Sequence, residues 1–385
     1  MIAPQYRPII GGYERAAERL SIELASRGHS VDVVTERRER DWPKAETFSG
    51  VTIRRLRCMP RKGLHVLTAL SSLALFLLVR GRRYQVWHVH QYGWSASLAA
   101  AVALLLRRPL VLKITNTGAN GIEAAVSALP FAALQRRLHR SVSACLATST
   151  RARAEAIAFG IDPEHVHTVP NSLDCDRFSP LAESGRAELR DRLDVADRTV
   201  ALFVGRLMPQ KDPILLLEAI SHVVRVHPEL RLVVLGDGPL LPELEEYIQR
   251  ERLEDSVLLA GYCEDPLEWY QAADFYVSSS SIEGLSNSLM EAMSCGLPVV
   301  CTRVSGSEDV VTEEVGALVE PGDALGLAEA IRDLIVMGNA RSVMGIEARR
   351  RAKKLYSLDE VVRQVEIVYF EISPNPDFRG DQSRG

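Results

Sequence analysis

The chain has 385 residues, of which 46% are hydrophobic and 25% are charged, as is typical of a globular protein of two or three domains. This composition excludes disordered, collagen-like and small disulfide-rich proteins. The net charge of −4 is too balanced to indicate a nucleic-acid partner. Six scattered cysteines, without a Cys-x-x-Cys pair, predict neither a zinc site nor a disulfide framework, so a cytoplasmic location is expected.

The charge is unevenly distributed along the chain. Residues 1–180 carry 25 Lys and Arg against 14 Asp and Glu, a net charge of +11, and the remaining 21 and 36 leave −15 for the rest. No acidic residue lies between Thr47 and Ile122. Two explanations stay open. The basic residues form a solvated face, or they form a surface that binds an anionic acceptor or the inner face of a membrane.

Short β-rich segments alternate with longer helical patterns in the first half. The apolar segment 64–79 is shorter than the roughly 20 residues that span a bilayer, which predicts a buried or interfacial helix. The predicted strands are 30–35, 51–55, 85–90, 110–114, 143–147 and 165–169. The predicted helices are 13–27, 64–80, 95–107, 122–140 and 151–159.

The alternation restarts after a polar segment at 180–198. The predicted strands are 200–204, 231–235, 257–259, 275–278, 298–302 and 316–319, and the predicted helices are 213–226, 240–252, 287–295, 323–337, 341–354 and 358–370. The prediction is an α/β protein with two Rossmann-like, doubly wound domains that face each other across a cleft. The expected parts are domains at 1–180 and 181–354, a C-terminal helical segment at 355–372 that is free to pack back on the first domain, and a disordered tail at 373–385.

The start of the first domain is unusual. Gly11 and Gly12 open a helix, as in a strand-to-helix turn that contacts a phosphate, yet residues 1–10 have the pattern of a loop. They also lack the features of a signal peptide. The hypothesis is that the first strand is missing from this chain, and a native protein with the mass of this sequence would contradict it.

The segment 278–302 predicts a binding site at a helix N-terminus. A loop with Glu283 and Gly284 follows a strand, a helix begins near Ser286, and Gly296 ends it. Free amides at such an end attract a phosphate, and carboxylates accept hydrogen bonds from sugar hydroxyls. Glu291 has a second explanation, a capping box with Ser288.

Two cations follow the strand at 200–204. Arg206 suits a diphosphate by its planar fork and Lys211 by its point charge, although both could equally be solvated. The same pattern of a strand followed by a tight turn recurs at 236–239 and at 261–265.

These motifs, in this order, resemble the retaining GT-B glycosyltransferases of glycosyltransferase family 4. The resemblance runs from about Gly11 to Lys354, and the motifs are strong together although each is weak alone. The motifs are GGYE at 11–14, RGH at 27–29, HVH at 88–90, PNSLD at 170–174 with RF at 177–178, VGRL at 204–207 with KD at 211–212, GDGP at 236–239, and Glu283 with Glu291 in EGLSNSLMEAMSCGLPVV.

The resemblance implies roles by position. Arg206 and Lys211 would bind the diphosphate, Glu291 the ribose, and Glu283 would lie near the donor sugar. The amides of Leu285, Ser286 and Asn287 would hold the distal phosphate, Gly12 would let the first-domain loop approach it, and Gly236 and Tyr262 would lie near the base. Retention in this family is ascribed to front-face attack with electrostatic stabilisation of the leaving diphosphate, without a metal or other cofactor.

Three features depart from the family pattern. Thr115 or Asn116 stands where members often carry a histidine, Ser172 replaces a glycine, and the first strand is missing. These positions leave the sugar and acceptor side open. His90, at the end of a predicted strand, could belong to that side or to the core, while His88 is expected to be a satisfied core histidine.

The leading hypothesis is therefore an enzyme that moves a sugar from a nucleoside diphosphate sugar to a glycan or lipid-linked acceptor in cell-surface polysaccharide biosynthesis. A nucleotide-sugar epimerase, a glycogen-synthase-like enzyme and an inactive nucleotide-sugar-binding scaffold are the alternatives. The sequence Asp174-Cys175-Asp176 matches the metal-binding motif of another transferase class, but it falls inside the PNSLD segment, and no metal is expected.

Overall fold

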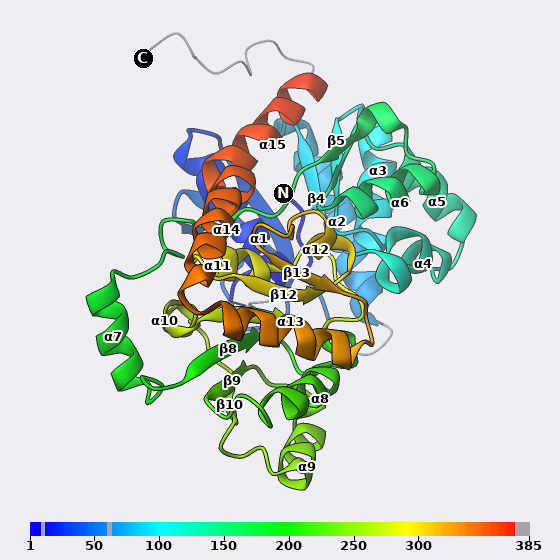
Figure 1. The fold of residues 1–385 in the computed structure, drawn as a ribbon. Coiled ribbons are helices and arrows are strands. Elements are labelled where there is room, and N and C mark those ends of the chain that lie inside the picture. Colours follow the sequence, from blue (N-terminus) through cyan, green and yellow to red (C-terminus); the bar gives the residue numbers. More distant parts are fainter. Residues whose placement is uncertain (9–11, 60–63, 374–385) are drawn as a thin grey trace. The chain divides into compact units, whose positions relative to one another are not determined.

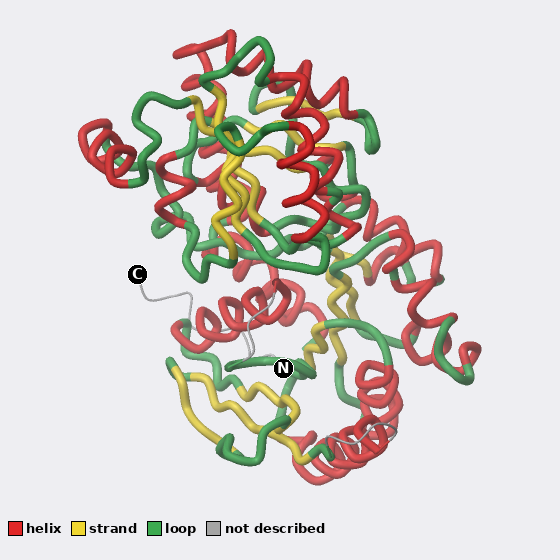
Figure 2. The backbone as a smooth tube through the Cα atoms, turned by 90° about the horizontal axis from the view of Figure 1, so that it is seen from below, coloured by secondary structure: helices red, strands yellow, loops and turns green. Residues whose placement is uncertain are grey.

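The computed structural model describes residues 1–8, 12–59 and 64–373 (Figure 1). The chain divides into two compact units, one of residues 1–172 with 358–385 and one of residues 173–357. Each unit has a sheet with helices against it, as the doubly wound prediction requires (Figure 2); the sheet is parallel throughout in the second unit and parallel apart from one strand in the first.

The first unit contains most of the predicted elements and one unpredicted strand, β2. Its strands are β1 (Asp32–Arg37), β2 (Ala45–Phe48), β3 (Val51–Arg57), β4 (Trp87–His90), β5 (Leu110–Ile114), β6 (Ala144–Ala147) and β7 (Val166–Thr168). Its helices are α1 (Gly12–Ser26), α2 (Leu64–Arg80), α3 (Trp94–Leu106), α4 (Ile122–Ser127), α5 (Ala132–Arg140), α6 (Thr150–Phe159) and α15 (Leu358–Ile372), with short 3₁₀ turns at Gly81–Arg83, Gly118–Asn120 and Pro163–His165.

The expectation that no strand precedes the first helix is wrong for these residues. Ile2 forms parallel bridges to both Val34 in β1 and Val89 in β4. Its amide donates to His88 O at 2.7 Å, and its carbonyl accepts from His90 N at 3.0 Å. Residues 1–3 therefore occupy the central position that joins the sheet order β1-β3-β2 to the order β4-β5-β6-β7.

One further prediction in this unit needs correction, and one strand was not predicted. The helix predicted at 122–140 is interrupted after Ser127, because Pro130 cannot continue it and Phe131 is left-handed, with φ 58°. β2 pairs antiparallel with β3 and is largely exposed, so it lacks the apolar alternation by which a strand is recognised.

The second unit has one six-stranded, entirely parallel sheet in the order β10-β9-β8-β11-β12-β13. Its strands are β8 (Thr199–Val204), β9 (Leu230–Leu235), β10 (Val257–Gly261), β11 (Phe275–Ser278), β12 (Val299–Thr302) and β13 (Gly316–Val319). Its helices are α7 (Glu183–Arg192), α8 (Pro213–Val223), α9 (Leu241–Glu251), α10 (Leu267–Ala272), α11 (Asn287–Ser294), α12 (Ser305–Glu308), α13 (Ala324–Met337) and α14 (Arg341–Tyr356), with 3₁₀ turns at Pro209–Lys211 and Gly338–Ala340.

The sequence did not predict α7, α10 and α12. The first is largely polar, with only Leu189 and Arg190 buried, and the other two are six and four residues long. Such helices show too few turns of apolar periodicity to be recognised.

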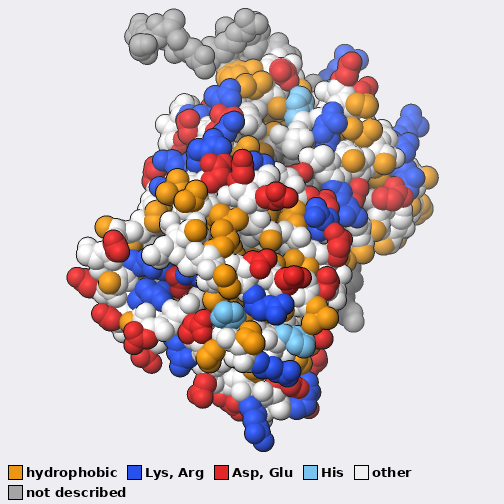
Figure 3. All heavy atoms as spheres, in the orientation of Figure 1, with side chains coloured by type: hydrophobic (Ala, Val, Ile, Leu, Met, Phe, Trp, Pro, Cys, Tyr) orange, Lys and Arg blue, Asp and Glu red, His pale blue; other side chains and the backbone are white. Residues whose placement is uncertain are grey.

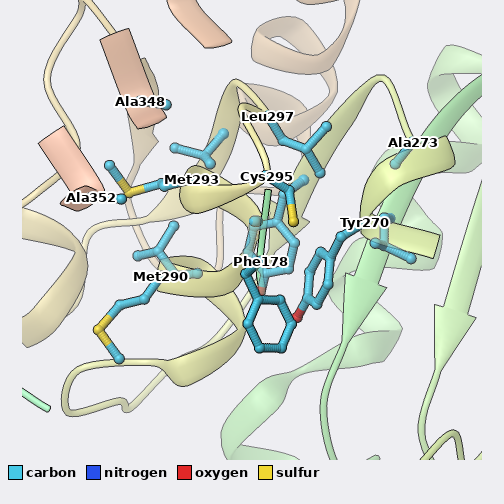
Figure 4. Close-up of a cluster of buried hydrophobic side chains, with 14 of the residues drawn as sticks. Phe178, Tyr270, Ala273, Met290, Met293, Cys295, Leu297, Ala348 and Ala352 are labelled. Carbon is cyan, nitrogen blue, oxygen red and sulfur yellow. The ribbon is translucent and has the colours of Figure 1, made fainter. Parts of the chain in front are cut away.

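The boundary between the units lies at 172/173, earlier than the predicted 180/181. Leu173 N donates to Tyr356 O at 2.7 Å, so the chain enters and leaves the second unit at neighbouring points. Phe178 packs in the core of this unit with its ring edge-on to Tyr270 and the ring centroids 6.0 Å apart (Figure 4). Burial of these side chains assigns 173–180 to the second unit.

The C-terminal helix α15 packs on the first unit, against α1. Arg27 pairs with Asp359 at 2.6 Å and with Glu366 at 3.1 Å, and His29 lies 2.9 Å from Glu366. The valines of α15 join the core around Val33 and Ile53. Residues 374–385, most of the tail predicted to be disordered, lie outside the described residues.

One buried hydrogen bond fixes α15 to the sheet. His88 Nδ1 lies 2.6 Å from the Tyr369 hydroxyl, whereas its buried Nε2 has no hydrogen-bond partner among the described residues, so His88 is a core histidine as expected but only one of its ring nitrogens is satisfied. We expect Tyr369→Phe to lower the free energy of unfolding by about 1–3 kcal/mol, because it leaves a buried imidazole nitrogen without a partner. Tyr247→Phe, at a partly buried ring in the second unit, is the control. Equal urea midpoints for the two variants would contradict this assignment.

Candidate functional site

The second sheet has a topological switch point between β8 and β11. From β8 the chain builds outward through β9 and β10, and from β11 it builds the other way through β12 and β13. In open parallel sheets the loops after two such strands diverge and leave room for a ligand at their carboxyl ends. The loops that follow β8 and β11 carry the predicted catalytic residues.

The loop after β8 contains both predicted cations. Arg206 is exposed, and no ion pair of its side chain is present among the described residues. Lys211 ends a 3₁₀ turn and has 19% of its side chain exposed. The next residue, Asp212, takes a left-handed conformation with φ 43°, and its carboxylate accepts from Leu215 N at 3.3 Å to begin α8.

Hydrogen bonds join this loop to the loop after β11. The Ser279 hydroxyl donates to the carbonyls of Lys211 at 2.9 Å and Asp212 at 2.8 Å, and Ser281 N donates to Gln210 O at 2.9 Å. These bonds fix Lys211 beside Glu283, and the ammonium forms an ion pair with the carboxylate. The structure thus brings together two of the three residues predicted to be catalytic.

Glycines allow the backbone segments of this site to approach closely. A Cβ at Gly236 would lie 1.9 Å from Gly205 O, and a Cβ at Gly306 in α12 would lie 2.1 Å from Gly284 O. Any larger residue would displace the loop after β8 or the loop that carries Glu283. The predicted importance of Gly236 therefore has a steric basis, whereas α12 and its contact with Gly284 were not predicted.

The N-terminus of α11 follows Glu283 directly. Ser286 is the N-cap residue but makes no side-chain cap hydrogen bond. Its hydroxyl lies 2.9 Å from the hydroxyl of Ser288, which also lies 2.9 Å from the Tyr276 hydroxyl. Leu285 and Ser286 are buried, and Asn287 is half-buried. The first turn of α11 can therefore present backbone N–H groups and a positive dipole end to an anion.

Glu291 lies on the inner face of α11. The capping box considered for Ser288 and Glu291 is wrong, because Ser288 lies inside the helix rather than at its N-cap. Glu291 is 5% exposed and accepts a hydrogen bond from the Tyr270 hydroxyl at 3.0 Å. Burial and this carboxylate raise the pKa of Tyr270 well above its usual value, so Tyr270 remains a hydrogen-bond donor.

The buried face of α11 packs into the core of the second unit. Met290, Met293 and Cys295 all belong to the same buried cluster as Phe178 and Tyr270 (Figure 4). Packing of this kind fixes the position of the helix, and hence of its N-terminus, to within the tolerance of a close-packed core.

Tyr262 follows the last residue of β10, Gly261, which has a φ of 73°. The tyrosine is 68% exposed, and Gly236 N donates to Gly261 O at 2.8 Å. The ends of β9 and β10 therefore lie together, and Tyr262 offers an exposed aromatic ring near Gly236, as expected of a surface on which a base stacks.

The first unit contains the residues predicted for the acceptor side. Gly12 begins α1. Thr115 is half-buried and Asn116 is exposed, both directly after β5. His90, in contrast, is only 3% exposed, and its ring stacks on His88 with the centroids 4.3 Å apart. Burial and neighbouring positive charges lower the pKa of His90 well below its usual value, so the imidazole is neutral.

Lys113 is the residue of this region that sequence reasoning did not single out. It lies opposite His90 in the register of β4 and β5, and it is 3% exposed. Burial, together with the charge of Arg19, lowers its pKa to about 7. A buried lysine in an otherwise apolar strand was the available signal, since β5 reads Leu-Val-Leu-Lys-Ile.

Two groups bear on the expectation that no metal is bound. Asp174 accepts hydrogen bonds from the amides of Asp176 and Arg177, so the Asp-Cys-Asp sequence forms a turn. In the first unit Glu36, Cys58 and His65 come within 4.8 Å of one another, but Arg38 pairs with the same Glu36 carboxylate at 3.1 Å. A guanidinium at that carboxylate opposes a cation there.

Two family models match this chain, one in each unit. The family model described as "Glycosyl transferases group 1" matches residues 186–351, and the model described as "Glycosyl transferase 4-like domain" matches residues 11–172. A D-inositol 3-phosphate glycosyltransferase of Kineococcus radiotolerans is 31% identical, over 89% of this chain and 86% of its own length. A phosphatidylinositol N-acetylglucosaminyltransferase subunit of Arabidopsis thaliana is 28% identical, over 96% and 80%.

Solved structures share the fold over nearly the whole chain. HepE of Anabaena in complex with UDP matches with a TM-score of 0.80 at 20% identity, over 96% of this chain and 98% of its own. The sucrose-phosphate synthase of Thermosynechococcus elongatus matches with a TM-score of 0.78 at 22% identity, again over 96% and 98%. The fold is therefore GT-B, with two Rossmann-like domains.

We expect the burial of Lys113 to make the stability of the protein depend on pH. Because its folded pKa of about 7 lies below the unfolded value of 10.5, the unfolded chain binds the extra proton between these values. The resulting destabilisation is complete below pH 7 and is relieved as the pH rises toward 10.5. We expect Lys113→Met to raise the free energy of unfolding at pH 7 by on the order of a few kcal/mol and to flatten its pH dependence above 7.

Urea unfolding at several pH values measures this effect. Lys354→Met, at an exposed lysine of α14, is the matched control and should leave the curve unchanged. A loss of stability in Lys113→Met would show instead that the ammonium has a stabilising partner.

Proposed function

The chain belongs to the group 1 glycosyltransferases, and from this premise we propose that it is a retaining, metal-independent enzyme of cell-surface polysaccharide biosynthesis. It would move a sugar from a nucleoside diphosphate sugar to a glycan or lipid-linked acceptor. The observation that carries the proposal is the arrangement at the switch point of the second unit. There the Lys211–Glu283 ion pair lies directly before the N-terminus of α11.

The diphosphate would bind to the loop after β8 and to α11. Arg206 and Lys211 supply two positive charges, and the amides of residues 285–287 supply hydrogen-bond donors. An arriving diphosphate carries more negative charge than one carboxylate, so it competes with Glu283 for the ammonium of Lys211. This competition would turn Glu283 toward the hydroxyl groups of the donor sugar.

The nucleoside would lie toward the ends of β9 and β10. Glu291 would accept hydrogen bonds from the ribose hydroxyls, with its other contact to Tyr270 fixing the carboxylate. Tyr262 and Gly236 would lie near the base, where the glycine permits close approach and the tyrosine offers a ring. Gly12, at the start of α1, would let the first-domain loop approach the distal phosphate.

The proposed reaction needs charge complementarity more than a protein nucleophile. The bond between the anomeric carbon and the diphosphate breaks while the acceptor oxygen attacks from the same face, and the acceptor proton passes to the departing phosphate oxygen. Arg206, Lys211 and the helix amides stabilise the negative charge that grows on the diphosphate. His90, Thr115, Asn116 and the buried Lys113 are the candidates that orient the sugar and acceptor.

The comparisons support this proposal at a coarser level. The names of the relatives are those of glycosyltransferases, and the name of the Arabidopsis relative includes a phosphatidylinositol, which favours a lipid-linked acceptor. The HepE structures hold UDP and UDP-glucose, which favours a nucleotide sugar as donor. All six cysteines are free thiols, which fits a reducing cytoplasm.

Donor identity can be tested with the purified protein. We expect one of the UDP-, GDP- or ADP-sugars to raise the melting temperature and to be cleaved slowly, with the anomeric configuration retained. Proton NMR of the released sugar measures the configuration. Donor binding without turnover, even when lipid-linked acceptors are supplied, would favour a scaffold, and release of an epimerised sugar would favour an epimerase.

A substitution of Glu283 should lower the transfer rate without weakening the affinity for the nucleoside diphosphate. We expect Glu283→Gln to keep or tighten the affinity for the nucleoside diphosphate, because Lys211 loses its competing partner, while the transfer rate falls at least tenfold, or about 1.4 kcal/mol. Lys211→Met should weaken nucleotide binding instead. Titration calorimetry and initial rates measure the two effects.

A matched control exists in the same unit. Glu320→Gln removes the same charge from an exposed ion pair with Arg303 and should change neither quantity. Parallel loss of affinity and rate in Glu283→Gln would contradict the assigned role.

A further inference from the structure

The helix α2 is apolar, yet the protein does not bury it. Of its 17 residues only Leu73 and Leu77 are buried. The segment Leu64–Arg83 has a mean hydropathy of 1.7 in its most apolar window, and 17% of that window is buried. A core helix with this composition would be mostly enclosed, so α2 presents an apolar face that the described residues do not cover.

Four exposed leucines line one face of α2, with the exposed Ser71 between the two pairs. Leu64, Leu67, Leu75 and Leu78 follow one another at helical spacings of three, eight and three residues. Their exposed fractions are 42%, 61%, 65% and 48%. Residues at these spacings share one face of a helix. This face points away from the sheet, on which α2 packs through its opposite side.

The end of α3 continues this surface. Leu104 and Leu105 are 55% and 71% exposed, and α2 and α3 pack against each other. The side chain of Arg108 donates to the carbonyl of Arg82 at 2.7 Å, which brings the C-terminal ends of the two helices together. We define the α2–α3 patch as these apolar residues and the arginines at the same end: Leu64, Leu67, Leu75, Leu78, Leu104, Leu105, Arg80, Arg82, Arg83, Arg107 and Arg108.

The patch has no acidic counter-charge of its own. The chain from Thr47 to Ile122 contains no Asp or Glu, and four of the five arginines are exposed while Arg108 is half-buried. The surface over α3 and α5 shows hydrophobic and basic side chains side by side, with some acidic side chains among them (Figure 3). Apolar side chains bordered by arginines are the chemistry that binds an anionic lipid surface.

We propose that the α2–α3 patch is a membrane-docking surface, with α2 lying in the plane of an anionic bilayer and the arginines at the lipid headgroups. A spanning arrangement conflicts with the fold, because α2 is the crossover from β3 to β4 and packs on the sheet through Leu73 and Leu77. A symmetric dimer through this face conflicts with the charge, because an isologous contact would bring like-charged arginines together.

This inference goes beyond the proposed transfer reaction and does not require it. Docking through α2 and α3 would hold the first unit at the bilayer surface, where a lipid-linked acceptor is found. The donor loops belong to the second unit, so donor binding reports separately on the proposed function.

Sedimentation with vesicles tests the proposal on the full chain. We expect binding to vesicles of phosphatidylcholine with about one third phosphatidylglycerol, weaker binding to phosphatidylcholine alone, and a decrease with added salt. The triple variant Leu67→Gln, Leu75→Gln and Leu78→Gln should bind the anionic vesicles at least about tenfold more weakly. Glutamine keeps the helix propensity at these exposed positions.

The matched control is Val336→Gln, Val343→Gln and Ile346→Gln, three exposed apolar residues on α13 and α14. It should bind as the unaltered chain does. The triple variant Arg80→Gln, Arg82→Gln and Arg83→Gln should lose about fivefold per arginine at low salt and most of the salt dependence. Its control is Arg225→Gln, Arg250→Gln and Arg252→Gln, three exposed arginines of the second unit.

Three results would overturn the proposal: no binding of the unaltered chain to anionic vesicles at low salt, equal binding of the leucine variant and its control, or a dimer in solution that the leucine variant dissociates. The donor-induced shift in melting temperature is measured on every variant. An unchanged shift shows that a variant is folded and that lost vesicle binding concerns the patch alone.

Discussion

The parallel pairing of β8 with β11 is the constraint on which the proposed donor site depends. The order of the strands reverses there, so the loop with Lys211 and the loop with Glu283 begin side by side although 72 residues separate the two side chains. Ser279 and Ser281 then bond these loops together, and glycines at 236 and 306 let neighbouring backbone approach within distances that no Cβ permits. The ion pair is a consequence of this framework.

The two units handle charge in different ways. In the second unit Lys211 and Glu283 neutralise each other, and the buried Glu291 has the Tyr270 hydroxyl as a donor. In the first unit Lys113 and His90 are buried beside each other. Burial lowers the pKa of both side chains and so favours their neutral forms. Such a lysine opposes folding at neutral pH, and residues that oppose folding are concentrated where function requires them.

The surface of the first unit shows a similar conflict in α2. Exposed leucines along this helix contribute nothing to the core, which is built instead from Leu73, Leu77 and the neighbouring strands. A soluble protein gains no stability from such a stripe, and it risks association through it. The adjoining arginines both limit self-association and attract an anionic partner. Site and surface thus lie on different units of one chain, joined at 172/173 and 357/358.

The sequence by itself determined the two doubly wound units and most of their elements, because the strands are apolar runs bounded by turns and the long helices have clear periodicity. It also predicted that Arg206, Lys211, Glu283 and the start of α11 belong to one site, since these follow strand ends in the linear order. It failed for Ile2, β2 and α12, which are too short or too exposed to show a pattern.

Only the tertiary structure decided what depends on neighbours far away in the chain. Residues 1–3 were identified as the central strand position by β1 and β4, which lie on either side of them. The pairing of Lys211 with Glu283, the bond of Glu291 to Tyr270 and the exposure of α2 likewise follow from packing between distant segments. Hydrophobic periodicity reports which face of a segment is apolar, but the fold determines whether another segment covers that face.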